Sequence, residues 1–206
     1  IGKDDTGRFI RGTLSSYGVD VSLLKEDDGV NSSFTDVMQA ADTGERTFFH
    51  YTGTNSCFGP EHIDWDALDC DLLHLAYISL LDRFDAPDAD YGTVMGRVLH
   101  EAQERGILTS VDTVSSPRAD YAHLVESAFR YCDYAFTNEV EGSMVSGLPC
   151  RDNDGRLITE NVIRTLERCM AFGVRRRLIL HCPEAGFCMD AEKGLSIVPS
   201  LALPKG

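Results

Sequence analysis

Apolar residues recur along most of the chain in a pattern that alternates between strand and helix. Residues 71–78 form a short, nearly continuous apolar run, as expected for a strand buried in a parallel sheet. Residues 91–105 and 159–172 carry apolar side chains at helical spacing, and Gly106 and Gly173 follow them as helix terminators. Further elements are expected as strands at 107–111, 134–137 and 177–182 and as a helix at 121–131. This alternation predicts βαβ units.

The N-terminal part of the chain follows a different pattern. Residues 7–17 have helical apolar spacing, whereas 33–40 and 46–51 are β-prone runs. The connection between these two runs, 42–45, reads Asp-Thr-Gly-Glu, which is typical of a hairpin loop. A hairpin placed before the alternating region predicts a small flap over the edge of the sheet.

These patterns together predict an α/β fold. We expect a doubly wound, mainly parallel sheet that is flanked by helices, with a small β-hairpin lid at about residues 30–55. The chain has 206 residues, of which 43% are hydrophobic, so it is long enough and apolar enough to build a substantial core.

Charge and hydropathy exclude some classes of partner. The formal net charge is −14, and an acidic surface repels phosphate backbones, so we expect no nucleic-acid partner. A nucleotide substrate remains compatible with this charge, because backbone amides and Mg²⁺ supply the local field of a nucleotide site. No apolar run reaches membrane-spanning length, so no membrane partner is expected.

The cysteines indicate the compartment. There are seven, at irregular spacing and without a C-x-x-C pair, so neither a zinc ribbon nor a redox motif is predicted. We expect free thiols in a reducing, cytoplasmic environment.

Polar residues follow three of the predicted strands. Asp112 follows 107–111, and Asn138 follows 134–137 with Glu141 one helical turn further on. The turn 183–186, which contains Glu184, follows 178–182. Ligands bind beyond the carboxyl ends of strands in open α/β sheets, and oxygen ligands of this kind suit Mg²⁺. Each residue taken alone is better explained as a helix cap or a turn residue, and Glu141 occupies the capping-box position relative to Asn138.

The segment Asn138-Glu139-Val140-Glu141, entered from a strand, resembles the N-x-x-E motif of PfkB-type (ribokinase-like) carbohydrate kinases. Three further stretches agree with that family in order and spacing. Residues 1–9 resemble its G-x-D-x-x-G turn, 45–55 resemble the lid strand that runs into a G-A-N segment, and 108–112 resemble a strand carrying a core aspartate. Thr54 replaces the alanine of G-A-N. The resemblance covers nearly the whole chain.

Two departures from the family pattern matter. The T-x-G-x-x-G turn near the nucleotide appears as residues 181–186, with His181 in place of the threonine and Pro183 in place of the first glycine. The N-terminal sugar-binding strand would precede Ile1, and the G-A-G-D signature with the general-base aspartate would follow Gly206. We therefore expect residues 1–206 to be a partial ribokinase-like domain that has no catalytic base of its own and is inactive alone.

The resemblance implies a phosphotransferase that moves the γ-phosphoryl group of ATP to a hydroxymethyl group of a sugar or sugar-like molecule, with Mg²⁺. The implied metal and phosphate residues are Asn138, Glu141 and Asp112. The implied sugar-binding residues are Asp4, Gly53 and Asn55. The implied nucleotide-binding residues are Glu184 and Gly186.

Several alternatives remain open. A nucleoside kinase of the same fold fits the residues, and so does a sugar- or nucleotide-binding protein without catalysis. A dehydrogenase-like Rossmann domain is disfavoured, because the sequence lacks the G-x-G-x-x-G fingerprint. Dimerisation through the lid and a monomer are both compatible with an exposed two-stranded hairpin.

Overall fold

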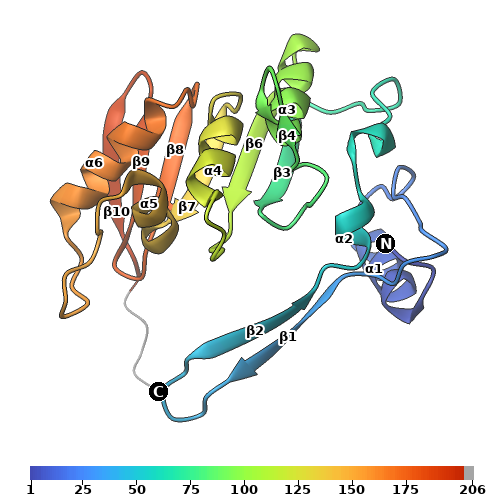
Figure 1. Ribbon diagram of the computed structural model, residues 1–206, viewed down its shortest axis with the longest axis horizontal. Coiled ribbons are helices and arrows are strands. Elements are labelled where there is room, and N and C mark those ends of the chain that lie inside the picture. The colour runs from blue at the N-terminus through green and yellow to red at the C-terminus, as the bar shows by residue number, and fades with distance from the viewer. Residues whose placement is uncertain (202–206) are drawn as a thin grey trace. The chain divides into compact units, whose positions relative to one another are not determined.

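The computed structural model describes residues 1–201, and it divides the chain into two compact units (Figure 1). One unit comprises Ile1–Leu68 and Leu80–Arg83. The other comprises Asp69–Ser79 and the chain from Phe84 onward. Among the residues described, no helix is both long and apolar enough to cross a membrane.

The first unit contains a helix that is capped by an aspartate. Helix α1 (Asp5–Ser16) begins after Asp4, whose side chain accepts a hydrogen bond from the Gly7 N–H. The helix ends at Ser16, and Gly18 just beyond it has a φ of 77°, the left-handed conformation that glycine adopts readily. The short helix α2 (Thr54–Cys57) and a 3₁₀ turn at Pro60–His62 complete this unit's helical structure.

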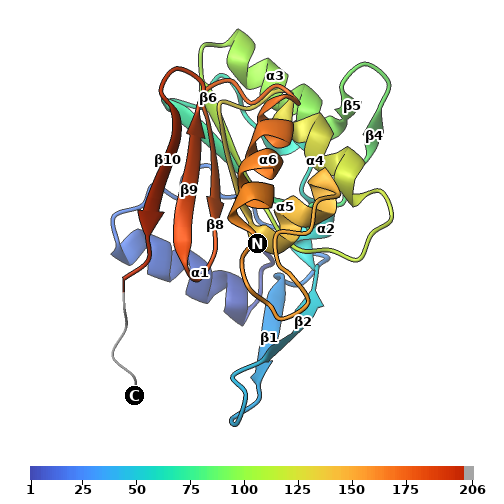
Figure 2. The same cartoon turned by 90° about the vertical axis from the view of Figure 1, so that its left-hand side faces the viewer.

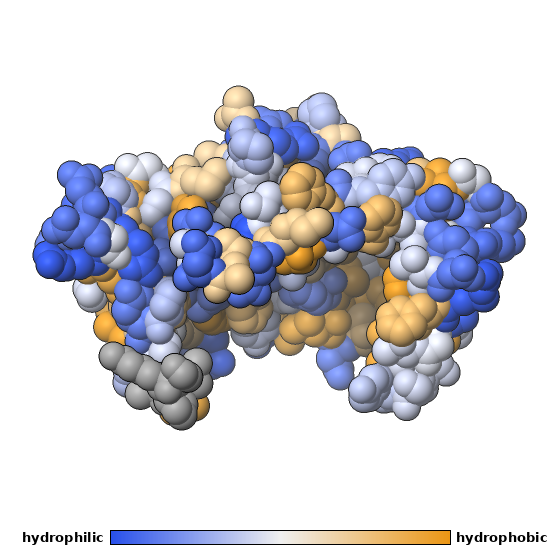
Figure 3. All heavy atoms as spheres, turned by 90° about the horizontal axis from the view of Figure 1, so that it is seen from below, coloured by the Kyte–Doolittle hydropathy of each residue, from blue (hydrophilic) through white to orange (hydrophobic). Residues whose placement is uncertain are grey.

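The predicted hairpin is confirmed. Strands β1 (Phe34–Gln39) and β2 (Arg46–Tyr51) pair antiparallel, with Phe34 opposite Tyr51. Every residue of both strands is exposed, so neither face of the hairpin is buried within the described chain. Figure 3 shows hydrophobic side chains at the molecular surface among hydrophilic ones.

The second unit is built on a six-stranded sheet with the order β10-β9-β8-β7-β6-β3. Its parallel strands are β3 (Leu72–Ile78), β6 (Leu108–Thr113), β7 (Tyr134–Asn138) and β8 (Arg177–His181). Its antiparallel strands are β9 (Ala185–Asp190) and β10 (Gly194–Pro199). The predicted mainly parallel α/β sheet is thus confirmed, and an antiparallel hairpin that the sequence analysis did not predict extends it.

Four helices pack on the same side of this sheet (Figures 1 and 2). They are α3 (Val94–Glu104), α4 (Tyr121–Phe129), α5 (Glu139–Ser146) and α6 (Thr159–Met170). The fully buried side chains include Phe84, Met95, Leu99, Val111, Leu166 and Leu178. The core therefore lies between the sheet and these helices, where burial of apolar area stabilises both layers.

Helix α3 begins later than the spacing of apolar residues predicts. The residues before it form a small hairpin of β4 (Pro87–Asp88) and β5 (Gly92–Thr93). Thr93 then caps the helix by accepting a hydrogen bond from the Gly96 N–H. Residues 91–93, predicted as the start of the helix, lie instead in the turn and second strand of this hairpin.

Candidate functional site at the carboxyl ends of the strands

Asn138 ends β7 and starts α5, where its side chain holds the first helical turn. The Asn138 Oδ1 accepts hydrogen bonds from the N–H groups of Val140 and Glu141, both at 2.9 Å. In return the Glu141 Oε2 accepts the Asn138 N–H at 3.1 Å. This is a complete capping box, and it places both side chains of the N-x-x-E segment at the carboxyl end of a parallel strand.

The Glu141 carboxylate is also bound to the neighbouring strand. The Thr113 hydroxyl at the end of β6 donates to Glu141 Oε2 at 2.5 Å, and the Ser115 hydroxyl donates to Oε1 at 3.1 Å. Only 4% of the Glu141 surface is exposed. Both carboxylate oxygens therefore have donors, and Glu141 joins the ends of β6 and β7 while it caps α5.

Asp112 lies at the same edge but belongs to the other face of β6. Its neighbours Val111 and Thr113 are buried, and alternation along the strand turns Asp112 the opposite way. Asp112 is half-buried, and this burial, followed by the charge of Glu141, raises the pKa of its carboxyl. The structure thus brings Asn138 and Glu141 into direct contact. Asp112 is a nearby carboxylate whose pKa is raised in part by the charge of Glu141.

These side chains suit a hydrated Mg²⁺ ion better than a directly coordinated one. In the described part of the chain, no three acidic, histidine or cysteine side chains assemble into a metal-binding group. The oxygens of Glu141 are already hydrogen-bonded, so they suit the water molecules of a hydrated Mg²⁺ better than direct coordination.

Tyr121 is a site residue that sequence reasoning missed. Its hydroxyl is buried beside Thr113 and has no hydrogen-bond partner of normal geometry. Burial, and then the charge of Glu141, raises the pKa of this phenol. Thr113 and Ser115 were missed as well, although hydroxyl residues directly after a buried strand are a usable signal.

The turn between β8 and β9 is tied to α5 by an arginine. Arg151 donates to Glu139 at 2.7 and 2.9 Å and to Glu184 at 2.8 and 2.9 Å. Its guanidinium also donates to the Gly155 carbonyl at 2.8 Å. Hydrogen bonds from Arg151 hold the pKa of Glu184 at about 2. We call Glu139, Arg151 and Glu184 the Arg151 clamp.

The two predicted nucleotide-binding residues therefore differ in whether they are free to contact a nucleotide. The Glu184 carboxylate is taken up by Arg151. Gly186 pairs with His181 across the β8–β9 ladder, and a Cβ at Gly186 would meet no atom within 4 Å. The backbone at Gly186 is thus open to a ligand, whereas the charge of Glu184 is neutralised from within the protein.

The predicted sugar residues of the first unit have strong local roles. Asp4 accepts hydrogen bonds from the Gly7 N–H, the Ser32 N–H and the Ser32 hydroxyl, at 2.7, 2.7 and 2.8 Å. Gly53 has a φ of 46°, and a Cβ there would lie 2.5 Å from the Asn31 carbonyl oxygen. Asp4 and Gly53 thus build the loops of this unit.

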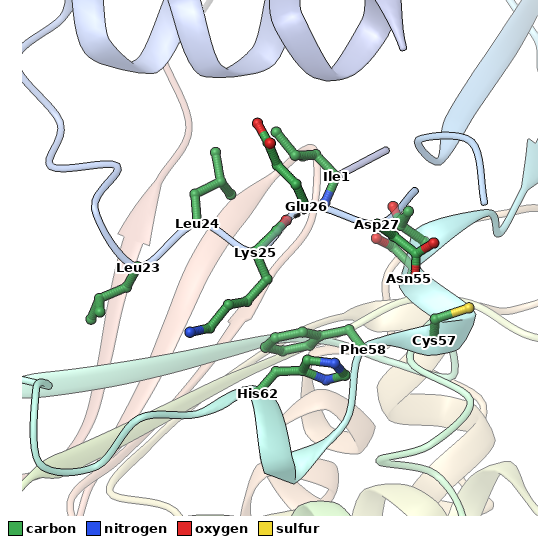
Figure 4. A pocket seen from close by; sticks show the side chains of 11 residues that line it. Ile1, Leu23, Leu24, Lys25, Glu26, Asp27, Asn55, Cys57, Phe58 and His62 are labelled. Atoms are coloured by element: carbon green, nitrogen blue, oxygen red, sulfur yellow. Dashed lines mark hydrogen bonds between the residues drawn. The ribbon is translucent and has the colours of Figure 1, made fainter. Parts of the chain in front are cut away.

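Asn55 lines a cavity of about 340 Å³ within the first unit (Figure 4). The Phe58 and His62 rings stack with their centres 5.7 Å apart along one wall, and the Lys25 side chain extends toward them. Asp27 lies beside Asn55 in the same view. Of the three predicted sugar residues, Asn55 is therefore the one with a side chain at a cavity.

Comparison with known proteins identifies the family. The model for the pfkB family carbohydrate kinases matches residues 1–201. A fructokinase structure from Xylella fastidiosa is 19% identical with a TM-score of 0.71, covering 98% of this chain and 60% of that one. A ribokinase from Arabidopsis thaliana, complexed with ribose and ATP, is 16% identical with a TM-score of 0.70, covering 99% and 60%.

An aminoimidazole riboside kinase from Salmonella enterica is 16% identical with a TM-score of 0.64, covering 99% of this chain and 62% of that one. At these identities the structural likeness shows the ribokinase-like fold alone, and the chain spans about 60% of the length of such proteins. The family match extends over almost every residue, so this chain belongs to the pfkB family of carbohydrate kinases.

Proposed function

We propose that the protein containing this chain transfers the γ-phosphoryl group of ATP to a hydroxymethyl group of a sugar or sugar-like molecule. The observation that carries the proposal is the Asn138–Glu141 capping unit, joined to β6 through Thr113, at the carboxyl edge of a parallel sheet in a pfkB-family chain. Phosphoryl transfer depends mainly on positioning and on charge neutralisation, which a rigid polar edge supplies.

Mg²⁺ would neutralise charge on the phosphates. Glu141 and Asn138 would orient its water molecules, and Asp112 would add a negative charge close to it. Gly186 would let the nucleotide approach the backbone of β9, and Glu184 would act through the Arg151 clamp. This assignment is supported by the geometry of the strand ends and by the resemblance of residues 138–141 to the family motif.

The acceptor would be recognised from the first unit. Asn55 is the proposed sugar contact, while Asp4 and Gly53 would hold the loops that carry the site. The β1–β2 hairpin is proposed as a lid that excludes water, which competes with the sugar as acceptor. The general base is proposed to be an aspartate outside residues 1–206.

A nucleoside kinase is the second candidate, favoured by the similarity to the aminoimidazole riboside kinase. We would assay the protein that contains this chain with Mg-ATP and two panels, one of simple sugars and one of nucleosides. Turnover of a sugar supports the proposal. Turnover of nucleosides alone supports the second candidate, and binding of either class without turnover identifies a non-catalytic binding protein.

We also propose a cytoplasmic location, in keeping with seven cysteines that are all free thiols in the structure.

A further inference from the structure

The Arg151 clamp joins three separate parts of the second unit. Glu139 is in the first turn of α5, Arg151 lies in the loop after this helix, and Glu184 lies in the β8–β9 turn. Glu139 and Arg151 are 12 residues apart, and Arg151 and Glu184 are 33 residues apart. The clamp is therefore a tertiary contact that holds the turn against the start of the helix.

Its geometry differs from that of an ordinary surface ion pair. The guanidinium makes two hydrogen bonds to each carboxylate, and the Arg151 and Glu139 side chains are only 26% and 11% exposed. The two bonds to Glu184 go to different oxygens, which is the strong and directional bidentate arrangement, and the Glu184 side chain is 48% exposed. Both bonds to Glu139 go to its Oε1. The hydrogen bonds that Arg151 donates to Glu184 and Glu139 raise its pKa, so it stays charged.

Backbone hydrogen bonds hold the main chain of the β8–β9 turn. Pro183 has no N–H to donate, so the turn lacks one of the backbone donors that a glycine at this position would provide. The bond closing the turn on itself runs from the Cys182 N–H to the Ala185 carbonyl at 3.0 Å. The Ser200 N–H also donates to the Glu184 carbonyl at 2.9 Å. Arg151 then fixes the Glu184 side chain from outside the turn.

The charges of the Arg151 clamp also affect how this edge of the sheet would interact with phosphate groups. Glu139 and Glu184 would repel the phosphates of a nucleotide if they were unpaired, because they lie beside the start of α5 and the end of β8. Arg151 lies between them and leaves the three groups with one net negative charge instead of two. The guanidinium thus reduces the repulsion at the edge where the proposed donor would bind.

We propose that Arg151 is a positioning residue for the phosphate donor. It fixes the β8–β9 turn against the N-terminus of α5 and screens two carboxylates from the polyphosphate of ATP. This inference rests on the proposed function, because it assigns the donor to this edge. Arg151 acts through the turn and through electrostatics, without contact with the reacting atoms.

The kinetic test compares Arg151→Ala with Arg177→Ala in the protein that contains this chain. Arg177 donates to Asp190 at 2.6 Å and so links the same two strands at their opposite end. We expect Arg151→Ala to raise the KM for ATP about tenfold, the effect of losing about 1.4 kcal/mol of binding. The KM for the sugar in Arg151→Ala should change less than about twofold. The KM for ATP in Arg177→Ala should also change less than about twofold, on the scale of an exposed ion pair.

Arg151→Lys provides the conservative variant. Lysine keeps the positive charge but loses the bidentate geometry, so its KM for ATP should lie between the wild type and Arg151→Ala. Equal KM values for ATP in Arg151→Ala and Arg177→Ala would overturn the proposal. An equal rise in the KM values for ATP and sugar in Arg151→Ala would overturn it too.

A second readout is independent of activity. Hydrogen exchange of the backbone amides at 184–186 should become faster in Arg151→Ala and stay unchanged in Arg177→Ala. If the wild type phosphorylates no sugar or nucleoside, the proposed function fails, while faster exchange still demonstrates the clamp. Unchanged exchange at the turn in an active enzyme would reject the clamp and leave the proposed function standing.

Discussion

At the residue scale, Glu141 combines two roles that a sequence presents as alternatives. It completes the capping box with Asn138, and it also receives the hydroxyls of Thr113 and Ser115. A residue that only capped its helix would have no need of donors from a neighbouring strand. The structure therefore makes Glu141 a link between helix and sheet, and its charge is held at the strand ends.

Glu141→Gln tests whether that charge serves catalysis. The amide keeps the shape and one oxygen acceptor, so the capping bond should largely survive. If Glu141 organises hydrated Mg²⁺, kcat should fall on the order of 10²-fold and the Mg²⁺ concentration for half-maximal rate should rise. We would measure initial rates across a Mg²⁺ series at saturating ATP. Identical curves for the two proteins would leave the capping role alone.

Asp4→Asn tests the role of Asp4 in stability. Hydrogen bonds from Gly7 and Ser32 lower the pKa of Asp4 below 3.8, so the folded state favours the charged carboxylate. The stabilisation is therefore present above pH 3.8 and is lost as the pH falls through the lower folded pKa. Asp4→Asn should melt at a lower temperature than the wild type at pH 7, and the difference should shrink on acidification.

Asp66→Asn serves as the control for this prediction, because Asp66 is exposed and loses the same charge. Its melting temperature should follow that of the wild type throughout the pH series. A gap between Asp4→Asn and wild type that stays constant down to pH 3 would contradict the assignment.

At the element scale, α5 is positioned by close packing as well as by its cap. A Cβ at Gly142 would lie 3.0 Å from Thr165 Cγ2 and 3.1 Å from Leu180 Cδ1. A glycine thus lets the helix that carries Glu141 approach both α6 and β8. The same helix is fixed at its start by the Arg151 clamp, so packing and charge act on one element.

Gly142→Leu should therefore destabilise the fold by about 1–3 kcal/mol or more through overpacking. Gly12→Leu is the matched control, because a Cβ at Gly12 in α1 meets nothing within 4 Å and leucine is the better helix former. Chemical denaturation measures both variants. Equal or higher stability for Gly142→Leu would show that α5 does not need this close approach.

The hairpin presents one face that is more apolar than the other. Phe34, Met38, Phe49 and Tyr51 share a face by strand alternation, and the Phe34 and Tyr51 rings lie 5.4 Å apart. On the opposite face, Phe48 lies under the Arg46 guanidinium. The apolar face is therefore the proposed dimer or substrate face of the lid.

Phe49→Asp should disrupt association through this face. If the lid joins two copies, sedimentation should show a dimer for the wild type and monomers for Phe49→Asp. Gln39→Asp on the opposite face should leave the dimer intact. A monomeric wild type, or a dimer in both variants, would remove the hairpin from the interface.

At the scale of the whole molecule, the described residues form two units that carry different parts of the proposed site. The larger unit holds the strand ends with the proposed metal and nucleotide residues, and the smaller holds the proposed sugar residue Asn55. We propose that the general base of the reaction is not among residues 1–206. The proposed reaction therefore needs a further aspartate.

The 206-residue chain assayed alone should show no kinase activity, whereas a longer protein that contains it should phosphorylate at least one simple sugar with Mg-ATP. A coupled ADP-release assay on both proteins measures this. Robust turnover by the 206 residues alone would show that the base lies within them.

Local signals determined much of the fold and part of the site. Apolar spacing sets the strands and helices of the larger unit, and the capping box at Asn138 and Glu141 spans only three residues, so both are legible in the sequence. Helix α3 begins three residues later than predicted, because residues 92–93 pair in a hairpin, and the β9–β10 hairpin was not predicted.

Only the tertiary structure decided which charged side chains are paired within the protein. Glu184 reads as an available acidic turn residue, yet its partner Arg151 lies 33 residues away. Thr113 reaches Glu141 across 28 residues, and Tyr121 is buried beside them. Contacts at such separation depend on the packing of the sheet against its helices, which no local pattern encodes. The sequence by itself thus determined the family and the elements, while long-range packing decided the state of each site residue.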